Sequence, residues 1–179
     1  MVRTWRRWAL LADDFGPGWE VDEDGYYADP NRLALFQRTF KYRGAGTAVV
    51  GTSEVNLVGS ELQLWPSLEQ ATAFIGSRRT LFEGAEGAAN FARLTAEDGG
   101  PTVTHPVTSL ETLPLGDQAL TLTITANWAS LGSQSTIFIW IRRGDLVSQT
   151  TIQGTTTPAP AELLALAELA AARLAGGES

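Results

Sequence analysis

His105 is the only histidine of the chain, and it lies in an alternating pattern typical of a β-strand, directly before Pro106. A histidine acts as a catalytic base when an acidic side chain orients it and a nucleophile lies within hydrogen-bond reach. No neighbouring motif supplies either group, and the chain contains no Gly-x-Ser-x-Gly motif. The sequence therefore predicts no catalytic residues and a structural or solvent-exposed His105. A hydrolase that uses His105 with a carboxylate such as Asp117 is the alternative.

Two acidic clusters, Asp13-Asp14 and Asp22-Glu23-Asp24, could bind calcium or act as an acid–base pair. The second cluster does not continue as an EF-hand loop, because the twelfth position of such a loop is Glu and here it is Leu33. Zinc sites mostly draw on several Cys and His side chains, and this chain has no cysteine and one histidine. We therefore expect no metal site, no cofactor, and solvated turns at both clusters.

Aromatic side chains are the remaining candidates, as binding groups rather than catalytic ones. Both alternating faces are apolar in residues 137–141, so this strand should be covered on both sides, whereas residues 120–128 carry Thr and Asn on one face. A sheet face that is apolar only in part can form an apolar concavity with a few polar groups, as small-ligand sites do. The aromatic residues that could line it are Trp65, Trp128, Trp140, Phe138, Tyr26 and Tyr27. Alternatively, the N-terminal segment closes this face as a second core through Trp5 and Trp8.

The composition is that of one folded domain. A length of 179 residues, of which 44% are hydrophobic and 18% charged, suits a single domain over residues 1–179 with a full core. The formal net charge of −7 argues against nucleic acid as a partner, since nucleic-acid binders gather Lys and Arg on one face.

Membrane and export signals are weak in the printed sequence. No apolar run approaches the roughly 20 residues of a membrane span, so we expect a protein that is not membrane-spanning. The apolar part of the N-terminus is shorter than the roughly 7–15 residues of a signal-peptide core. Met1 is consistent with a native start and equally with the replacement of a removed export signal or anchor.

Apolar residues at spacings of three and four predict the helices. They indicate a short N-terminal helix over residues 4–13, a second short helix at about 86–94, and two main amphipathic helices at about 67–83 and 160–175. Ser67 is expected to cap the first main helix, because its hydroxyl can accept a hydrogen bond from the free amides of the first turn.

Alternation predicts an antiparallel sheet of six or seven strands, rich in meander connections, with the clearest strands near 120–128, 136–141 and 146–153. In the stretch 47–65 the apolar parity changes between Val55 and Leu62, which predicts a β-bulge or bend at Gly59-Ser60. The expected fold class is therefore α+β, with one face of the sheet packed by the helices at 67–83 and 160–175.

Five motifs spread over nearly the whole chain carry a resemblance, and one of them is the hairpin sequence Arg142-Arg-Gly-Asp145 near its end. The others are Leu10-Leu-Ala-Asp-Asp-Phe-Gly-Pro-Gly-Trp19, Leu64-Trp65-Pro66 before a Ser-capped helix, Leu113-Pro-Leu-Gly-Asp117, and the C-terminal stretch Glu162-Leu-Leu-Ala-Leu-Ala-Glu-Leu169. Together they resemble exported bacterial sensor or lipoprotein-type domains, such as the extracellular sensor of the mycobacterial kinase PknH and PsbP-like lipoproteins such as LpqN. The resemblance implies helices against an antiparallel sheet, an extracytoplasmic location, and binding of ligands or partners there. The PknH-type sensor has disulfide-forming cysteines and this chain has none, so the resemblance bears on fold and export more than on a ligand.

Three classes of function remain open from the sequence. The first is a non-enzymatic extracytoplasmic sensor-type domain that binds a small apolar ligand or a protein partner through the Trp and Tyr set. The second is a structural or interaction domain without a ligand pocket. The third is the hydrolase that uses His105.

Overall fold

The computed structural model describes residues 5, 8–50, 53–97, 102–129 and 132–176. Its strands are β1 (Trp19–Tyr27), β2 (Ala34–Tyr42), β3 (Val49–Val50), β4 (Ser53–Leu64), β5 (Val103–Leu113), β6 (Gln118–Trp128), β7 (Gly132–Arg143) and β8 (Leu146–Gly154). Its helices are the 3₁₀ helix Ala12–Phe15 and the α-helices α1 (Leu68–Phe82), α2 (Gly87–Glu97) and α3 (Pro160–Gly176). No helix within the described residues is both long and apolar enough to cross a membrane.

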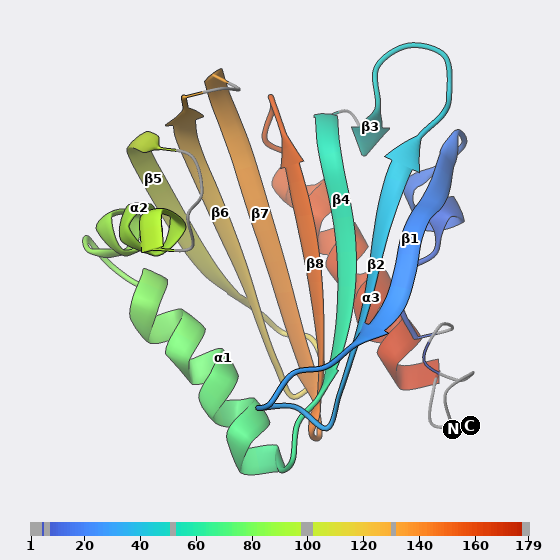
Figure 1. Cartoon of the computed structure of the whole chain (residues 1–179), viewed down its shortest axis with the longest axis vertical. Helices are drawn as coiled ribbons and strands as arrows, with labels where there is room; N and C mark the ends of the chain where they lie inside the picture. Colours follow the sequence, from blue (N-terminus) through green and yellow to red (C-terminus); the bar gives the residue numbers. More distant parts are fainter. Residues whose placement is uncertain (1–4, 6–7, 51–52, 98–101, 130–131, 177–179) are drawn as a thin grey trace.

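Seven of the strands form one antiparallel sheet in the order β1-β2-β4-β8-β7-β6-β5, and the short β3 pairs with β4 (Figure 1). Strands β5 to β8 follow one another as a meander, because each is joined to the next by a short turn. The last strand, β8, then pairs with β4 and so joins the meander to the N-terminal strands. The predicted α+β class and the antiparallel sheet of six or seven main strands are confirmed.

The helices cover opposite faces of the sheet. Figure 1 shows α1 and α2 in front of the β5 side of the sheet and α3 behind it. Strand β7 explains the arrangement, since Ile137, Ile139 and Ile141 belong to the core under α3, whereas Trp140 belongs to the core under α1 and α2. We call these two sides the α3 face and the α1 face. The expectation that both main helices pack on one face is wrong, because a strand that is apolar on both sides needs a cover on each.

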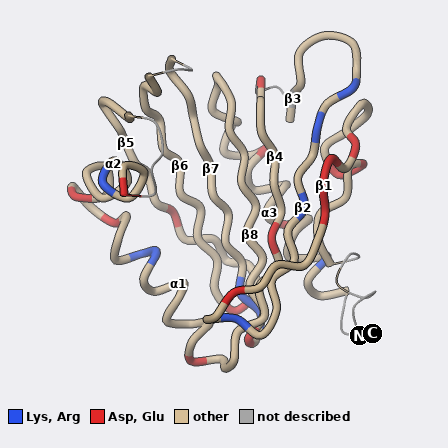
Figure 2. Tube along the Cα trace, viewed as in Figure 1, with Lys and Arg blue, Asp and Glu red and all other residues tan. Residues whose placement is uncertain are grey.

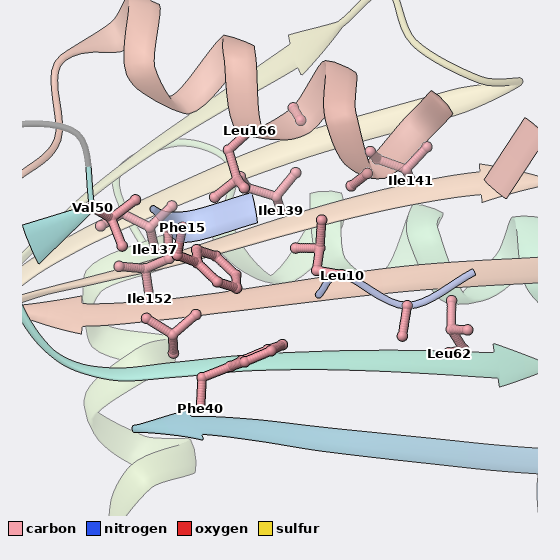
Figure 3. Close-up of a cluster of buried hydrophobic side chains, with 14 of the residues drawn as sticks. Leu10, Phe15, Phe40, Val50, Leu62, Ile137, Ile139, Ile141, Ile152 and Leu166 are labelled. Atoms are coloured by element: carbon pink, nitrogen blue, oxygen red, sulfur yellow. The ribbon is translucent and has the colours of Figure 1, made fainter. Parts of the chain in front are cut away.

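The N-terminal segment shares the α3 face with α3 (Figure 3). Leu10 and Phe15 are buried there among residues of β2, β4, β7 and β8, and Trp5 joins the same core. The segment therefore helps to close a second core, as the alternative interpretation of the sequence supposed.

The helix expected over residues 4–13 does not run through residues 8–13, the stretch of it that the structure describes without gaps. Residues 1–4 and 6–7 lie outside the described residues. Among the described ones Trp5 is in 3₁₀ conformation, residues 8–11 form a turn and an irregular stretch, and Ala12–Phe15 form a 3₁₀ turn. Tertiary contacts outweigh the helical periodicity: the Leu10 carbonyl accepts a hydrogen bond from Arg38 Nη1 at 2.9 Å, and the Leu11 amide donates to the Asp14 carboxylate at 2.7 Å. Asp14 also holds the segment to α3 through Arg173, with nitrogen–oxygen distances of 2.7 and 2.5 Å.

The irregularity of β4 lies earlier than the sequence predicted. The register of β4 is continuous through Gly59 and Ser60 on both neighbours, and it shifts instead between Val55 and Leu57. Val55 and Leu62 thereby both reach the α3 face, while Leu57 is 43% exposed. A change of parity shows that one extra residue lies between Val55 and Leu62, but it does not show where. A bulge at Asn56 therefore accounts for the pattern as well as one at Gly59.

The crossing of β4 and β8 at this bulge generates a stability prediction. A Cβ atom at Gly154 would lie 2.0 Å from the Glu54 carbonyl oxygen and 2.8 Å from Val55 Cα, so both clashes involve backbone. We expect Gly154→Ala to lower the free energy of unfolding by about 2–3 kcal/mol. Gly76→Ala, on an exposed turn of α1 with nothing within 4 Å of the added Cβ, should raise it by about 0.5–1 kcal/mol. Urea denaturation of both variants checks the pair, and similar midpoints would contradict the predicted close approach at Gly154.

Candidate functional site

The six aromatic residues proposed from the sequence do not meet in one pocket. Tyr26 lies on the α3 face, with its ring centroid 6.3 Å from that of Trp5 and 5.2 Å from that of Phe36. Trp128 packs edge-on against Phe91 of α2, with ring centroids 6.1 Å apart. The rings of Phe138 and Trp140 stack on the α1 face, with centroids 5.3 Å apart. Tyr27 is the last residue of β1 and lines a hollow formed with residues 28–34. Trp65 packs against Phe74 of α1.

His105 and Asp117 do not form a dyad. His105 is exposed and stands at the irregularity near the start of β5, where its φ of 52° is the one left-handed non-glycine conformation among the described residues. Asp117 follows the other end of that strand, which places the two at opposite ends of a strand about 30 Å long. The Asp117 carboxylate accepts hydrogen bonds from Arg142 and from the Gly144 amide, and so fixes the turn between β7 and β8.

A pocket of about 670 Å³ lies between α1 and the connection from β1 to β2. Its volume is within the range of small-ligand sites, which is about 300–1,000 Å³. Ten residues line it: Pro30, Asn31, Arg32, Trp65, Pro66, Gln70, Ala73, Phe74, Ser77 and Arg78. The pocket thus combines two arginines, three neutral polar side chains and an apolar remainder, and none of its lining residues is acidic.

The turn Asp29-Pro30-Asn31-Arg32 positions the first arginine. The Asp29 side chain accepts a hydrogen bond from the Asn31 amide at 2.8 Å and forms an ion pair with Arg32. Such short side-chain to backbone bonds are typical of Asp before a proline turn. Arg32 Nε also donates to Gln63 Oε1 at 3.2 Å, and its Cζ atom lies 5.0 Å from the centroid of the Trp65 ring. Arg32 is therefore held by an acid, an amide and an aromatic ring.

Helix α1 positions the second arginine. The helix begins after Ser67, whose hydroxyl accepts a hydrogen bond from the Gln70 amide at 3.2 Å, as the sequence predicted. Phe74 and Arg78 follow on one side of the helix at the spacing of one turn. Arg78 Cζ lies 4.7 Å from the centroid of the Phe74 ring. Arg32 Cζ lies 5.9 Å from the same centroid and closer to the Trp65 ring. Two guanidinium groups therefore flank one aromatic pair.

Arg78 differs from Arg32 in having no acidic partner among the described residues. It is half-buried, and its Nε is buried without a hydrogen-bond partner in that part of the chain. Burial lowers the pKa of Arg78, the nearby Arg32 lowers it further, and Glu61 acts against both. Two like charges in a partly desolvated place repel each other, and an anion bound between them would remove that penalty.

The charge of the pocket is opposite to that of the whole chain. The protein carries a net charge of −7, and Figure 2 shows acidic residues gathered along β1, where Glu20, Asp22, Glu23 and Asp24 lie. A guanidinium that stacks on a ring keeps its N–H edge free to donate hydrogen bonds in the plane. The donors that line the pocket therefore suit a carboxylate or a phosphate rather than a cation.

Neither arginine was found from the sequence, although Trp65 was. The missed signal is the spacing of Phe74 and Arg78 on α1, which puts a cation on the flank of an apolar stripe. Trp65 itself is buried, with Arg32 Cζ 5.0 Å from its ring centroid and the Phe74 ring centroid also 5.0 Å away. The ring therefore supports the arginine, instead of offering a free surface to a ligand.

Comparison with known proteins finds similarity in structure but not in sequence. No protein-family model matches the chain, and no curated protein matches it in sequence. Among solved structures the chain is similar to the extracellular domain of PknH from Mycobacterium tuberculosis, with 12% sequence identity and a TM-score of 0.46 over 85% of this chain and 68% of that one. The likeness concerns the general arrangement of sheet and helices, and no residue role is transferred from it.

The contrast between satisfied and unsatisfied arginines gives a second prediction. Arg142 is buried and donates hydrogen bonds to Gln118, Asp117 and the Gly144 carbonyl. We expect Arg142→Met to lower the free energy of unfolding by about 2 kcal/mol or more, since these charged hydrogen bonds are lost. Arg78→Met should leave it within about 0.5 kcal/mol of the original value or raise it, because no acidic partner is lost and repulsion from Arg32 ends. Thermal and urea unfolding of both variants provide the test, and a large loss in Arg78→Met would mean that Arg78 has a structural task.

Proposed function

We propose that this chain is a non-enzymatic binding domain that takes a small organic anion in the pocket formed by α1 and residues 30–32. The observation that supports the proposal best is Arg78, a half-buried arginine without an acidic partner among the described residues, beside Arg32 and in a pocket without acidic lining. An unpaired cation in such a place costs stability, and proteins commonly accept that cost at binding sites.

The ligand should bind through its charged end. Arg78 and the remaining donors of Arg32 would hold a carboxylate or phosphate, and the hydroxyl of Ser77 and the amide of Gln70 lie in the same lining. The body of the ligand would rest against the apolar part of the pocket, which Pro30, Pro66 and Ala73 provide. The sequence-based proposal of a small apolar ligand or a protein partner thereby becomes one of an organic anion with an apolar or ring-shaped body.

The pocket favours a small ligand over the two other classes of function. A structural domain without a pocket does not need two arginines beside an aromatic pair, and Asp117, the carboxylate that a hydrolase would use with His105, lies at the other end of β5. A location outside the cytoplasm stays part of the proposal on the strength of the sequence resemblance, and cell fractionation with an antibody against the chain tests it.

The binding proposal is tested with simple anions. Benzoate, phenyl phosphate and inorganic phosphate are titrated into the purified chain at constant ionic strength, with tryptophan fluorescence and melting temperature as readouts. Trp65 lies under Arg32, so its emission should change on binding, and a bound ligand should raise the melting temperature as its concentration rises.

Two neighbouring arginines of α1 give a matched pair of variants. Arg78→Gln should weaken binding of the anions about tenfold or more, the equivalent of roughly 1.4 kcal/mol or more. Arg79→Gln removes the same charge from the next residue, which donates to Thr112 and does not line the pocket, and should leave affinity within about twofold of the original. Equal losses in both variants would indicate general charge attraction and contradict a site at Arg78.

A further inference from the structure

A polar surface continues from the pocket at Trp65 along one face of β4. Alternate residues of a strand point to one side of the sheet, about 7 Å apart. Trp65, Gln63, Glu61 and Gly59 are such alternate residues, and they lead from the pocket along the α1 face towards the middle of the sheet. In Figure 1 no labelled helix lies in front of β4 and β2, whereas α1 and α2 lie in front of the β5 side.

The polar side chains on this part of the face are linked to the pocket by hydrogen bonds. Gln63 is 1% exposed, accepts from Arg32 Nε at 3.2 Å and donates to Glu61 Oε2 at 3.0 Å. Glu61 Oε1 accepts a further bond from Gln37 Nε2, also at 3.0 Å. The chain of contacts therefore runs without interruption from the anion-binding arginine to the open face of β2 and β4.

Strand β8 supplies the other side of this surface. Gln149 is the register partner of Glu61, and its Oε1 accepts a hydrogen bond from Trp140 Nε1 at 2.7 Å. Thr151 is the register partner of Gly59, where an added Cβ would meet nothing nearer than a backbone oxygen at 3.8 Å. The surface is therefore flat at Gly59. We call Gln37, Glu61, Gln149 and Thr151 the amide strip, and the buried Gln63 links it to Arg32.

The chemistry of the amide strip fits a polyhydroxylated ring. Each side-chain amide offers both donors and an acceptor, and a sugar hydroxyl is likewise donor and acceptor at once. The only charged member is Glu61, whose two oxygens already accept from neutral amides. An ordinary solvated sheet face carries long charged side chains with free rotamers, whereas these side chains are held in place by hydrogen bonds, which lowers the entropic cost of binding.

We infer that the anion of the pocket is borne by a saccharide, a sugar acid or a sugar phosphate, whose hydroxyl groups bind along the amide strip. The inference rests on the proposed function, since the same ligand places its charged group at Arg78 and Arg32. The two sources of negative charge share the sugar ring, so the experiment includes both.

The test compares ligands that have the same charged group with and without hydroxyl groups. Glucuronate is compared with benzoate, and glucose 6-phosphate with phenyl phosphate, by titration calorimetry on the purified chain at constant ionic strength. Gln37→Ala and Gln37→Leu both remove the amide of Gln37, which is linked to the pocket through Glu61 and Gln63. Thr123→Val serves as the matched control, because Thr123 is also half-buried in the sheet but lies on the α3 face beside Ile137.

The inference requires that at least one sugar anion binds more tightly than its phenyl counterpart. It also requires that Gln37→Ala and Gln37→Leu each weaken that sugar about three- to tenfold, while the affinity for the phenyl anions stays unchanged and Thr123→Val has no effect on either. Preference for glucuronate or for glucose 6-phosphate then decides between carboxylate and phosphate. If the phenyl anions bind through Arg78 and the sugars bind no better, or the strip variants have no effect, the inference falls and the proposed function stands. If no anion binds, both fall.

Discussion

The ladder between β4 and β8 joins two parts of the sheet that are built from distant parts of the chain. The N-terminal part contains β1, β2 and β4, the meander contains β5 to β8, and the register from Val55 opposite Gly154 to Leu64 opposite Leu146 is what holds them together. A hydrogen bond from the Trp65 amide to the Asp145 carbonyl, at 3.0 Å, extends the same connection to the turn between β7 and β8. Both hydrophobic cores depend on this ladder, since each takes residues from strands on either side of it or from helices that follow those strands.

The ladder also places the candidate site. Because β4 ends beside the tip of the last hairpin, α1 starts there and packs over β6 and β7, with one flank towards β4. That flank carries Phe74 and Arg78, while the turn before β2 brings in Arg32. The pocket thus arises where a helix that belongs to the core of the meander meets a loop that belongs to the N-terminal strands. Meeting points of this kind are common positions of ligand sites.

The strands and main helices could be predicted from periodicity because their partners are close in sequence or because their apolar spacing is regular. Ser67 as a cap and the alternation of 120–128 are examples, and both reflect local rules that tertiary structure leaves intact. The expected helix over 4–13 does not run through residues 8–13, because there the contacts that decide the conformation are distant in sequence. Apolar residues of this stretch are buried against the sheet. Arg38 donates to the backbone of the stretch, Asp14 bonds both to that backbone and to Arg173 of α3, and no local pattern contains the long-range contacts of Arg38 and Arg173.

The candidate site was even less accessible to sequence reasoning, since its two arginines come from distant segments. Pairing them requires the register of β2 with β4 and the direction of α1, which no spacing along the chain encodes. The aromatic residues were a better signal for core than for ligand: Trp65, Trp140 and Trp128 each pack against a neighbouring ring. What the sequence did carry was the two-sided apolar pattern of 137–141, from which the covered opposite faces follow directly.

The ion pair between Asp14 and Arg173 has a consequence for folding during synthesis. Arg173 leaves the ribosome 159 residues after Asp14, and the core that Leu10 and Phe15 close needs β8 and α3, which follow the segment by a similar distance along the chain. The apolar side chains of this segment therefore stay unprotected until β8 and α3 have emerged. Contacts between such remote positions make folding slow, because a long loop must close before they form. The nascent chain should accordingly be a stronger substrate for chaperones than its finished surface would suggest.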